Sequence, residues 1–264
     1  MAQEKSQAIL LKAHNWSESS RIVLFFTSDF GKLRLTDRGG RSLKSKRGRL
    51  MPFALLELTF YKSEKQSIGY LTDCDIQKVF SFEGEGSLGR LAYASAATEL
   101  INLLLPEEEA QPYLFDYTVT FYNLVDTASK RALPALFIAY FLRLLSRLGY
   151  HPSLNYCAVS GDEFTKFAST TSTVNFSPAK GGIVSPPCQV ASERYIALSP
   201  DCFQSLVTLQ TASLTEAANR IVSFADAGQI LFALSSFISY QAELKAGLNS
   251  LEFLDKLKRT HLKG

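Results

Sequence analysis

Histidine and cysteine are scarce in this sequence, with three and four copies among 264 residues, which limits the chemistry it can support. The histidines fall in unrelated regions and do not indicate a base with an orienting partner. A phosphate loop of the GxxxxGK[ST] type is also missing. Asp73 and Asp75 could suggest metal-ion catalysis and Cys74 a thiol nucleophile, but we interpret them as solvated carboxylates around a core thiol. We therefore expect a binding protein and not an enzyme.

Long hydrophobic runs and a strong net charge are lacking as well. The longest apolar run, 132–142, is shorter than the roughly 18–20 residues that cross a bilayer, and it contains Pro134. The N-terminus has no apolar stretch long enough for a secretory signal. The four cysteines are widely spaced, which does not indicate a disulfide framework. We expect a cytoplasmic protein with no membrane partner.

The first 80 residues carry the alternation and turn signals of β-strands. Lys32–Thr36 alternates polar and apolar residues, and Ser28–Gly31 has the composition of a tight turn. About five strands are predicted, over 8–13, 22–27, 32–36, 53–61 and 68–80, the last being one strand or two. Antiparallel strands in so short a chain usually close into a barrel, because closure removes exposed edges. The sequence thus predicts an OB-fold β-barrel over residues 1–80.

From about residue 86 the apolar residues repeat with helical spacing. Helices are predicted over 88–105, 113–128 and 134–148, with Gly149 as a C-cap. A capping box, Ser213–Glu216, predicts the start of a long helix that runs to about Tyr240, and a last helix would begin at Asn249 or Ser250. Residues 151–195, rich in Ser, Thr, Gly and Pro, are interpreted as a loop-and-hairpin module inserted in a helical domain, 81–264. The predicted class is α+β with two domains.

The segment after the third predicted strand is strongly basic. Its local charge is about +6, opposed only by Asp37, in a protein whose total is +3. A loop between strands lies on the surface, where clustered guanidinium and ammonium groups suit contacts with phosphates, although it could simply be solvated. The cations are Arg34, Arg38, Arg41, Lys44, Lys46, Arg47 and Arg49. We call residues 34–49 the basic segment and predict that it binds nucleic acid.

Aromatic residues near the basic segment could provide stacking platforms for bases, because an OB-fold sheet can present such rings. The alternative is that they form the barrel core, which is the simpler interpretation for Phe25, Phe26, Phe53 and Phe60. Trp16 lies in a polar turn and is the ring predicted to stack on a base.

Taken with these features, several motifs make the sequence similar to the RecO family. In the first part the similar motifs are 17–23 (SESSRIV), 26–27, 31–32, 38–41 (RGGR), 44–46 and 51–58 (MPFALLEL). In the second part, Leu144-Leu145, 149–154 (GYHPSL) and Cys157 resemble the family's junction between a helical core and a metal-binding module. The similarity spans nearly the whole chain in the same order.

The resemblance implies an OB-fold followed by a helical domain, in a recombination mediator of the bacterial cytoplasm or nucleoid. Such proteins bind single- and double-stranded DNA, anneal complementary strands and help RecA to displace single-strand-binding protein (SSB). RecR and the acidic, apolar tail of SSB are the family's usual protein partners. For the tail, the helical domain offers apolar helices edged by Lys130, Arg131, Arg143 and Arg147, although cations also favour helix C-termini without any ligand.

Many RecO proteins hold a structural zinc with two Cys-x-x-Cys pairs, and here the sequence departs from that pattern. The matching places read Cys157-Ala-Val-Ser160 and Ser185-Pro-Pro-Cys188, so each pair has lost one thiolate. Structural zinc takes four N or S donors, whereas a serine hydroxyl stays protonated. We expect no cofactor and no zinc in this degenerate zinc-finger-like module, with Cys157 and Cys188 as remnants. Apolar packing would hold it instead, through Phe164, Phe167, Val174, Phe176, Ile183 and Val184.

Two other classes of protein remain open at this point. An OB-fold protein could bind RNA, in RNA processing or at the ribosome, since stacking and phosphate contacts serve both nucleic acids. A scaffold could instead use the basic segment for an acidic protein partner. The large helical domain favours a mediator over a simple RNA chaperone.

Overall fold

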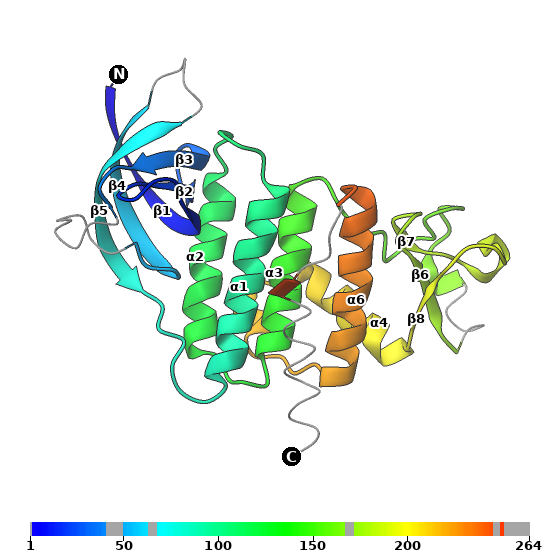
Figure 1. Cartoon of the computed structure of the whole chain (residues 1–264). Coiled ribbons are helices and arrows are strands. Elements are labelled where there is room, and N and C mark those ends of the chain that lie inside the picture. The colour runs from blue at the N-terminus through cyan, green and yellow to red at the C-terminus, as the bar shows by residue number, and fades with distance from the viewer. Residues whose placement is uncertain (1, 41–49, 63–67, 167–171, 245–248, 251–264) are drawn as a thin grey trace. The chain divides into compact units, whose positions relative to one another are not determined.

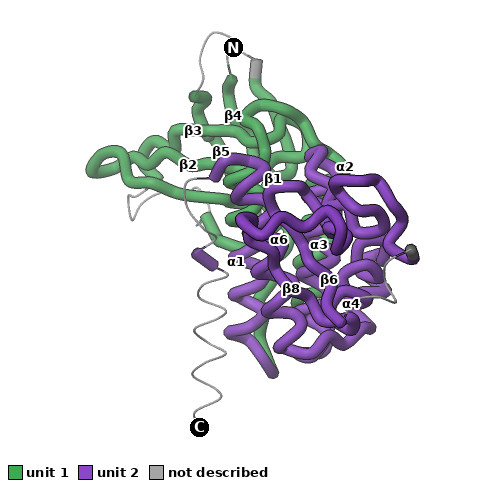
Figure 2. Tube along the Cα trace, turned by 90° about the vertical axis from the view of Figure 1, so that its right-hand side faces the viewer, with its two compact units in different colours: residues 1–84, 97–126 green, residues 85–96, 127–264 purple. Residues whose placement is uncertain are grey.

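The computed structural model describes residues 2–40, 50–62, 68–166, 172–244 and 249–250 (Figure 1). The chain forms two compact units, of which unit 1 contains residues 1–84 and 97–126 and unit 2 contains residues 85–96 and 127–264 (Figure 2). Strands come first and helices follow, as predicted. The units do not follow the predicted division at residue 80, because most of helix α2, Pro112–Thr127, belongs with the strands. Helix α1, Ser87–Leu104, contributes to both units.

Unit 1 is built on a closed five-stranded barrel. Its strands are β1 Ala2–Asn15, β2 Arg21–Thr27, β3 Gly31–Asp37, β4 Ala54–Lys62 and β5 Gly69–Val79. Their order is β1-β2-β3-β5-β4, and β4 pairs again with β1. All these pairings are antiparallel except that of β3 with β5, which joins Leu35 to Gly69 and Thr36 to Tyr70. All five predicted strands are present.

Strand β1 is longer than its apolar pattern predicted, because it pairs with two strands in turn. Residues 2–9 pair with β4 and residues 8–15 with β2, with an irregularity between Leu10 and Lys12. The polar residues before Ala8 join the strand through backbone pairing, which their side chains do not signal. One long, bulged strand thereby closes the barrel.

The two faces of β2 are both buried. Phe25 fills the barrel together with Leu33 of β3 and Phe60 of β4. On the opposite face of β2, Phe26 packs edge-on against Phe115 of α2, with ring centroids 5.4 Å apart. The unbroken apolar run of this strand is therefore explained by burial on both sides. For these aromatic residues, the simpler interpretation as core is correct.

A short segment after α1 covers part of the edge of β3. The Glu108 N–H donates to the Lys32 carbonyl at 3.0 Å, and Glu107 forms a parallel bridge with Lys32. Gly31 has a φ of 64°, and a Cβ at this position would lie 2.0 Å from the Glu109 carbonyl oxygen. Pairing with the segment satisfies backbone groups that would otherwise be exposed at the strand edge.

Unit 2 is organised around α3, Leu133–Arg147. All residues from Leu133 to Leu142 are buried, so the longest apolar run of the sequence lies in a core helix. Three further helices contact α3, namely α4 Pro200–Thr211, α5 Leu214–Ala217 and α6 Phe224–Gln241. Among the described helices, none has the length and apolar character required to cross a membrane.

The capping box Ser213–Glu216 is present, but it begins a helix of only four residues, so the predicted start of the long helix is wrong. The long helix, α6, begins at Phe224 because Ser223 provides a second N-cap, whose Oγ accepts from the Asp226 N–H at 3.1 Å. Helix α4 was not predicted, although Ser199 caps it and Pro200 occupies its first turn.

Residues 151–198 carry a small sheet of order β7-β6-β8. Its strands are β6 Val174–Ser177, β7 Gly182–Ile183 and β8 Ile196–Leu198, with 3₁₀ turns η1 Phe164–Lys166 and η3 Pro186–Cys188. Of the apolar residues expected to pack here, Val174, Phe176, Ile183 and Val184 are buried. Phe164 is half-buried, with its ring centroid 4.6 Å from that of Phe203, and Phe167 lies outside the described residues.

Candidate nucleic-acid interface

The C-terminal end of β3 carries Arg38, one of the residues predicted to bind nucleic acid. Arg38 follows β3 directly, and its guanidinium carbon lies 4.3 Å from the ring centroid of Tyr70. Tyr70 is the second residue of β5 and pairs with Thr36 of β3. A guanidinium over an aromatic face is held by a cation–π attraction of about 0.5–1 kcal/mol at an exposed site. Arg38 is therefore positioned at the point where the basic segment leaves the barrel.

Trp16 lies in the turn between β1 and β2, near the same end of β3. Its backbone N–H donates to the Ser20 carbonyl at 3.0 Å, which closes the turn. The preceding residue, Asn15, pairs with Arg21, and Arg21 pairs with Asp37. Two strand spacings of roughly 4.8 Å therefore separate the end of β1 from the end of β3. The Trp16 side chain is 70% exposed, so its ring is available to a ligand.

Asp37 does not neutralise the basic segment in the way that a simple charge count suggests. Its Oδ2 accepts from Arg21 Nε at 2.8 Å, and the Asp37 side chain is 1% exposed. A Cβ at Gly40 would come within 1.8 Å of the same Oδ2, so the start of the basic segment passes directly over this carboxylate. Asp37 thus holds Arg21 and supports the loop backbone, and its charge is already paired.

Arg34 is not brought together with Arg38 and Trp16. Its Nη2 pairs with Glu107 Oε1 at 2.5 Å, on the outer face of β3. Lys62 similarly pairs with Glu108 at 3.1 Å. The neighbouring Lys32 donates from Nζ to the Asn102 carbonyl at 2.8 Å, and its pKa is lowered, chiefly by burial. Arg34 and Lys62 thus join the barrel to the segment after α1, and Lys32 joins it to α1 itself, all within unit 1. Arg34 has a carboxylate partner, whereas the contact printed for Arg38 among the described residues is with the Tyr70 ring.

The other five cations of the basic segment lie outside the described residues: Arg41, Lys44, Lys46, Arg47 and Arg49. The described chain resumes at Leu50, which is partly buried against the barrel core. Phe53, another ring considered for stacking, lies 5.4 Å from Phe82 and 6.1 Å from Tyr122, centroid to centroid. It packs within unit 1.

The four cations proposed for the SSB tail form two separate pairs. Lys130 and Arg131 precede α3, whereas Arg143 and Arg147 lie in its last turns. With a rise of 1.5 Å per residue, the pairs are roughly 20 Å apart along the helix. Lys130 also lies 3.9 Å from Glu85. The four residues therefore lie at the two ends of α3.

Three of the four residues at the two degenerate Cys-x-x-Cys positions form a hydrogen-bonded cluster around one sulfur. Cys157 Sγ accepts from the Ser185 N–H and hydroxyl, both at 3.3 Å, and from the Ser160 N–H at 3.5 Å. Burial tends to raise the pKa of the Cys157 thiol, but hydrogen bonds from Ser160 and Ser185 outweigh it and lower this pKa to about 6. Within the described ranges no group of three or more His, Cys, Asp or Glu side chains could hold a metal. The serines act as donors to sulfur, so these residues do not fit a four-donor zinc site.

Tyr70 was not predicted from the sequence as part of the interface. Its position beside Arg38 depends on the parallel pairing of β3 with β5, which joins residues that are distant in the chain. The sequence signal that could have indicated this position is Gly69-Tyr70, a tyrosine next to a glycine at the start of a strand. Cys74 lies in the barrel core as expected, and burial raises the pKa of its thiol to about 12.

Comparison with known proteins identifies similar sequences over nearly the whole chain. The family described as "Recombination protein O N terminal" matches residues 1–80, and "Recombination protein O C terminal" matches residues 85–252. A protein of Symbiobacterium thermophilum named DNA repair protein RecO is 31% identical, over 98% of this chain and 99% of that one. Proteins of the same name from Desulforamulus reducens and Chlorobium limicola are 27% and 30% identical, over 98% and 96% of this chain and 96% and 88% of theirs.

Proposed function

The chain belongs to the RecO family, and on this premise we propose that it acts in DNA repair as a recombination mediator. In this proposal it binds single- and double-stranded DNA, anneals complementary strands and helps to load RecA onto SSB-coated single strands. The barrel serves as the OB-fold module, with RecR and the SSB tail as protein partners. The place of action is the cytoplasm.

The observation that carries the proposal is the exposed Trp16 ring, in the turn two strand spacings from the end of β3, where Arg38 rests on Tyr70. A base can stack on Trp16, and the Arg38 guanidinium can contact a phosphate while its other face rests on Tyr70. Annealing follows from the same charges, because a cationic surface that binds two strands reduces their mutual repulsion. Binding energy alone would drive the exchange.

The test is fluorescence anisotropy of a labelled single-stranded oligonucleotide with Trp16→Ala and Arg38→Ala variants. Loss of a stacked base costs about 1–3 kcal/mol, so we expect Trp16→Ala to weaken single-strand binding roughly tenfold or more. Trp16→Phe should restore most of this loss. The matched control is Arg220→Ala, which removes an exposed arginine from unit 2.

Duplex DNA provides a second control, because its bases are already stacked. Trp16→Ala should affect duplex binding much less than single-strand binding, whereas Arg38→Ala should weaken both. Unchanged binding in both variants would contradict the proposed barrel interface. An RNA oligonucleotide of the same sequence that bound more tightly than the DNA would support the RNA-binding alternative.

For the SSB tail we propose the Arg143–Arg147 end of α3, because two cations beside buried apolar residues suit an acidic peptide that ends in an apolar side chain. Lys130 and Arg131 provide the matched comparison at the other end. The Arg143→Glu/Arg147→Glu double variant should lose binding of a labelled tail peptide, while Lys130→Glu/Arg131→Glu should retain it. The reverse result would move the site to the other end of the helix.

A further inference from the structure

The outer face of β3 carries a second cation before Arg38. Leu35 points into the barrel core, so Arg34 and Thr36 on either side of it point outward. Thr36 pairs with Tyr70, the ring over which the Arg38 guanidinium lies. At about 3.3 Å per residue, Arg34 lies roughly 13 Å before Arg38 along the strand. A nucleic-acid strand that follows β3 from Arg38 would therefore reach Arg34 next.

Three consecutive glutamates after α1 cover this part of β3, and we call residues 107–109 the acidic segment. Glu107 forms an ion pair with Arg34 at 2.5 Å, and Glu108 forms one with Lys62, the last residue of β4, at 3.1 Å. Two carboxylates of the chain thus occupy two cations of the barrel surface. Carboxylate and phosphate are both anionic oxygen acceptors, and guanidinium and ammonium groups bind either.

The contacts that hold the acidic segment on β3 are individually weak. The Arg34 and Glu107 side chains are 42% and 48% exposed, and ion pairs at such positions contribute little and are screened by salt. The Glu108 N–H donates to the Lys32 carbonyl at 3.0 Å, but Glu108 has a φ of 61°, which is strained for a residue with a side chain. Release of the segment from β3 would relieve this strain.

We propose that the acidic segment is a built-in competitor for nucleic acid, and that Arg34 and Lys62 become phosphate contacts when a bound strand displaces it. The inference rests on the proposed function, because it requires a strand that binds at the barrel. Phosphates then replace the two carboxylates, and the counterions released from the strand favour the exchange. A strand too short to extend from Arg38 to Arg34 does not displace the segment.

The test measures binding of a labelled single-stranded oligonucleotide by fluorescence anisotropy, with the full-length protein. The Glu107→Gln/Glu108→Gln double variant keeps the size of both side chains and removes the charges that hold Arg34 and Lys62. We expect it to bind the oligonucleotide roughly three- to tenfold more tightly than the wild type, the range set by two exposed ion pairs. Adding Arg34→Ala to this variant should remove most of the gain.

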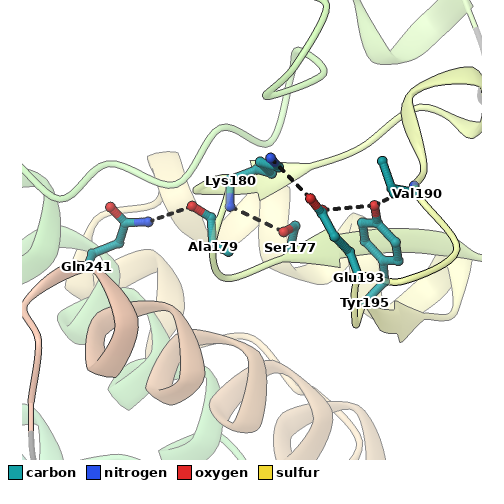
Figure 3. A network of polar contacts seen from close by, with 7 residues as sticks. All are labelled: Ser177, Ala179, Lys180, Val190, Glu193, Tyr195 and Gln241. Atoms are coloured by element: carbon teal, nitrogen blue, oxygen red, sulfur yellow. Dashed lines mark hydrogen bonds and ion pairs between the residues drawn. The ribbon is translucent and has the colours of Figure 1, made fainter.

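Two ion pairs of unit 2 provide a matched control for the change in charge. Lys180 pairs with Glu193 at 3.2 Å (Figure 3), and Lys130 with Glu85 at 3.9 Å. The Glu85→Gln/Glu193→Gln double variant removes the same two negative charges and releases two lysines outside the barrel. Its affinity should stay within about twofold of the wild type. An equal gain in both double variants would overturn the proposal, because net charge alone would then account for it.

Hydrogen exchange followed by mass spectrometry gives a second readout that does not depend on affinity. A bound ligand usually slows exchange where it contacts a protein, but a displaced segment loses its hydrogen bond to β3. On addition of the oligonucleotide, exchange in peptides that contain the acidic segment should become faster. Slower or unchanged exchange there would show that the segment stays on β3 and would overturn the proposal.

The Trp16→Ala variant distinguishes failure of this inference from failure of the proposed function. If Trp16→Ala weakens binding while Glu107→Gln/Glu108→Gln binds like the wild type, the segment does not compete and the barrel interface stands. If neither these variants nor Arg38→Ala changes binding, the strand does not bind at the barrel and both proposals fail.

Discussion

At the scale of single residues, Gly31 marks a close approach of two backbone segments in unit 1. A Cβ there would lie 2.0 Å from the Glu109 carbonyl oxygen, at a φ of 64°. We expect Gly31→Ala to lower the free energy of unfolding by about 2–4 kcal/mol, since a steric clash is added to backbone strain. Gly84 also has a positive φ, but a Cβ there meets nothing within 4 Å, so Gly84→Ala should cost about 1 kcal/mol. Urea unfolding measures both values. If Gly31→Ala and Gly84→Ala lowered the free energy of unfolding equally, the close approach to Glu109 would not contribute to the cost.

The lowered pKa of Cys157 makes stability depend on pH. The folded thiol titrates at about 6 and the unfolded one near 9, so between these values the unfolded chain binds more protons. The stabilisation is therefore complete above about pH 9 and is lost as pH falls through about 6. Cys157→Ser should destabilise the protein more at pH 8.5 than at pH 6, as measured by urea unfolding at both values. Cys202→Ser, whose thiol pKa is raised to about 11, should show no such increase over this range. The same loss at both pH values for Cys157→Ser would show that the thiolate does not stabilise the fold.

At the scale of elements, the start of α6 depends on a single serine cap. Ser223 Oγ accepts from the Asp226 N–H at 3.1 Å, and Asp226 lies in the first turn, where a negative charge is favourable. Ser223→Ala should lower the free energy of unfolding by about 1 kcal/mol, and Ser223→Asp should retain most of it. Thermal unfolding of both variants checks this, and an equal loss in both would argue against capping as the cause.

Local patterns in the sequence were sufficient to predict those strands and helices whose formation is determined by the residues within them. The alternation of Lys32–Thr36 predicted β3, and the apolar run before Gly149 predicted α3. The helix from Ser213 was wrong because two serine caps ten residues apart both suit a helix start, and tertiary packing decides where each helix ends. The first half of β1 was missed because it is stabilised by backbone pairing with β4. Partner strands of this kind are not visible in a local pattern.

At the scale of the whole molecule, the candidate interface was predicted in part. Its charge could be read from composition, and Trp16 from its polar turn. The contact of Arg38 with Tyr70, the pairing of Asp37 with Arg21 and the neutralisation of Arg34 by Glu107 join residues far apart in the chain. These contacts form because the barrel closes and because the segment after α1 pairs with β3. They could not be predicted from the sequence and were found only in the structure.

The distribution of charge over the molecule predicts a steep salt dependence of DNA binding. The total charge is +3, yet the basic segment alone carries about +6, so the positive charge proposed to contact DNA is local. If about five phosphates of a single strand are contacted, the slope of log K against log salt is near −3.5, and affinity falls roughly 100-fold between 50 and 200 mM salt. Arg38→Ala should reduce the slope by about 0.7, the share of one phosphate contact, whereas Arg220→Ala should leave it unchanged. Anisotropy titrations over a salt series measure these slopes. A slope near zero in the wild type would mean that phosphate contacts contribute little, and that stacking or a protein partner accounts for the function of this surface.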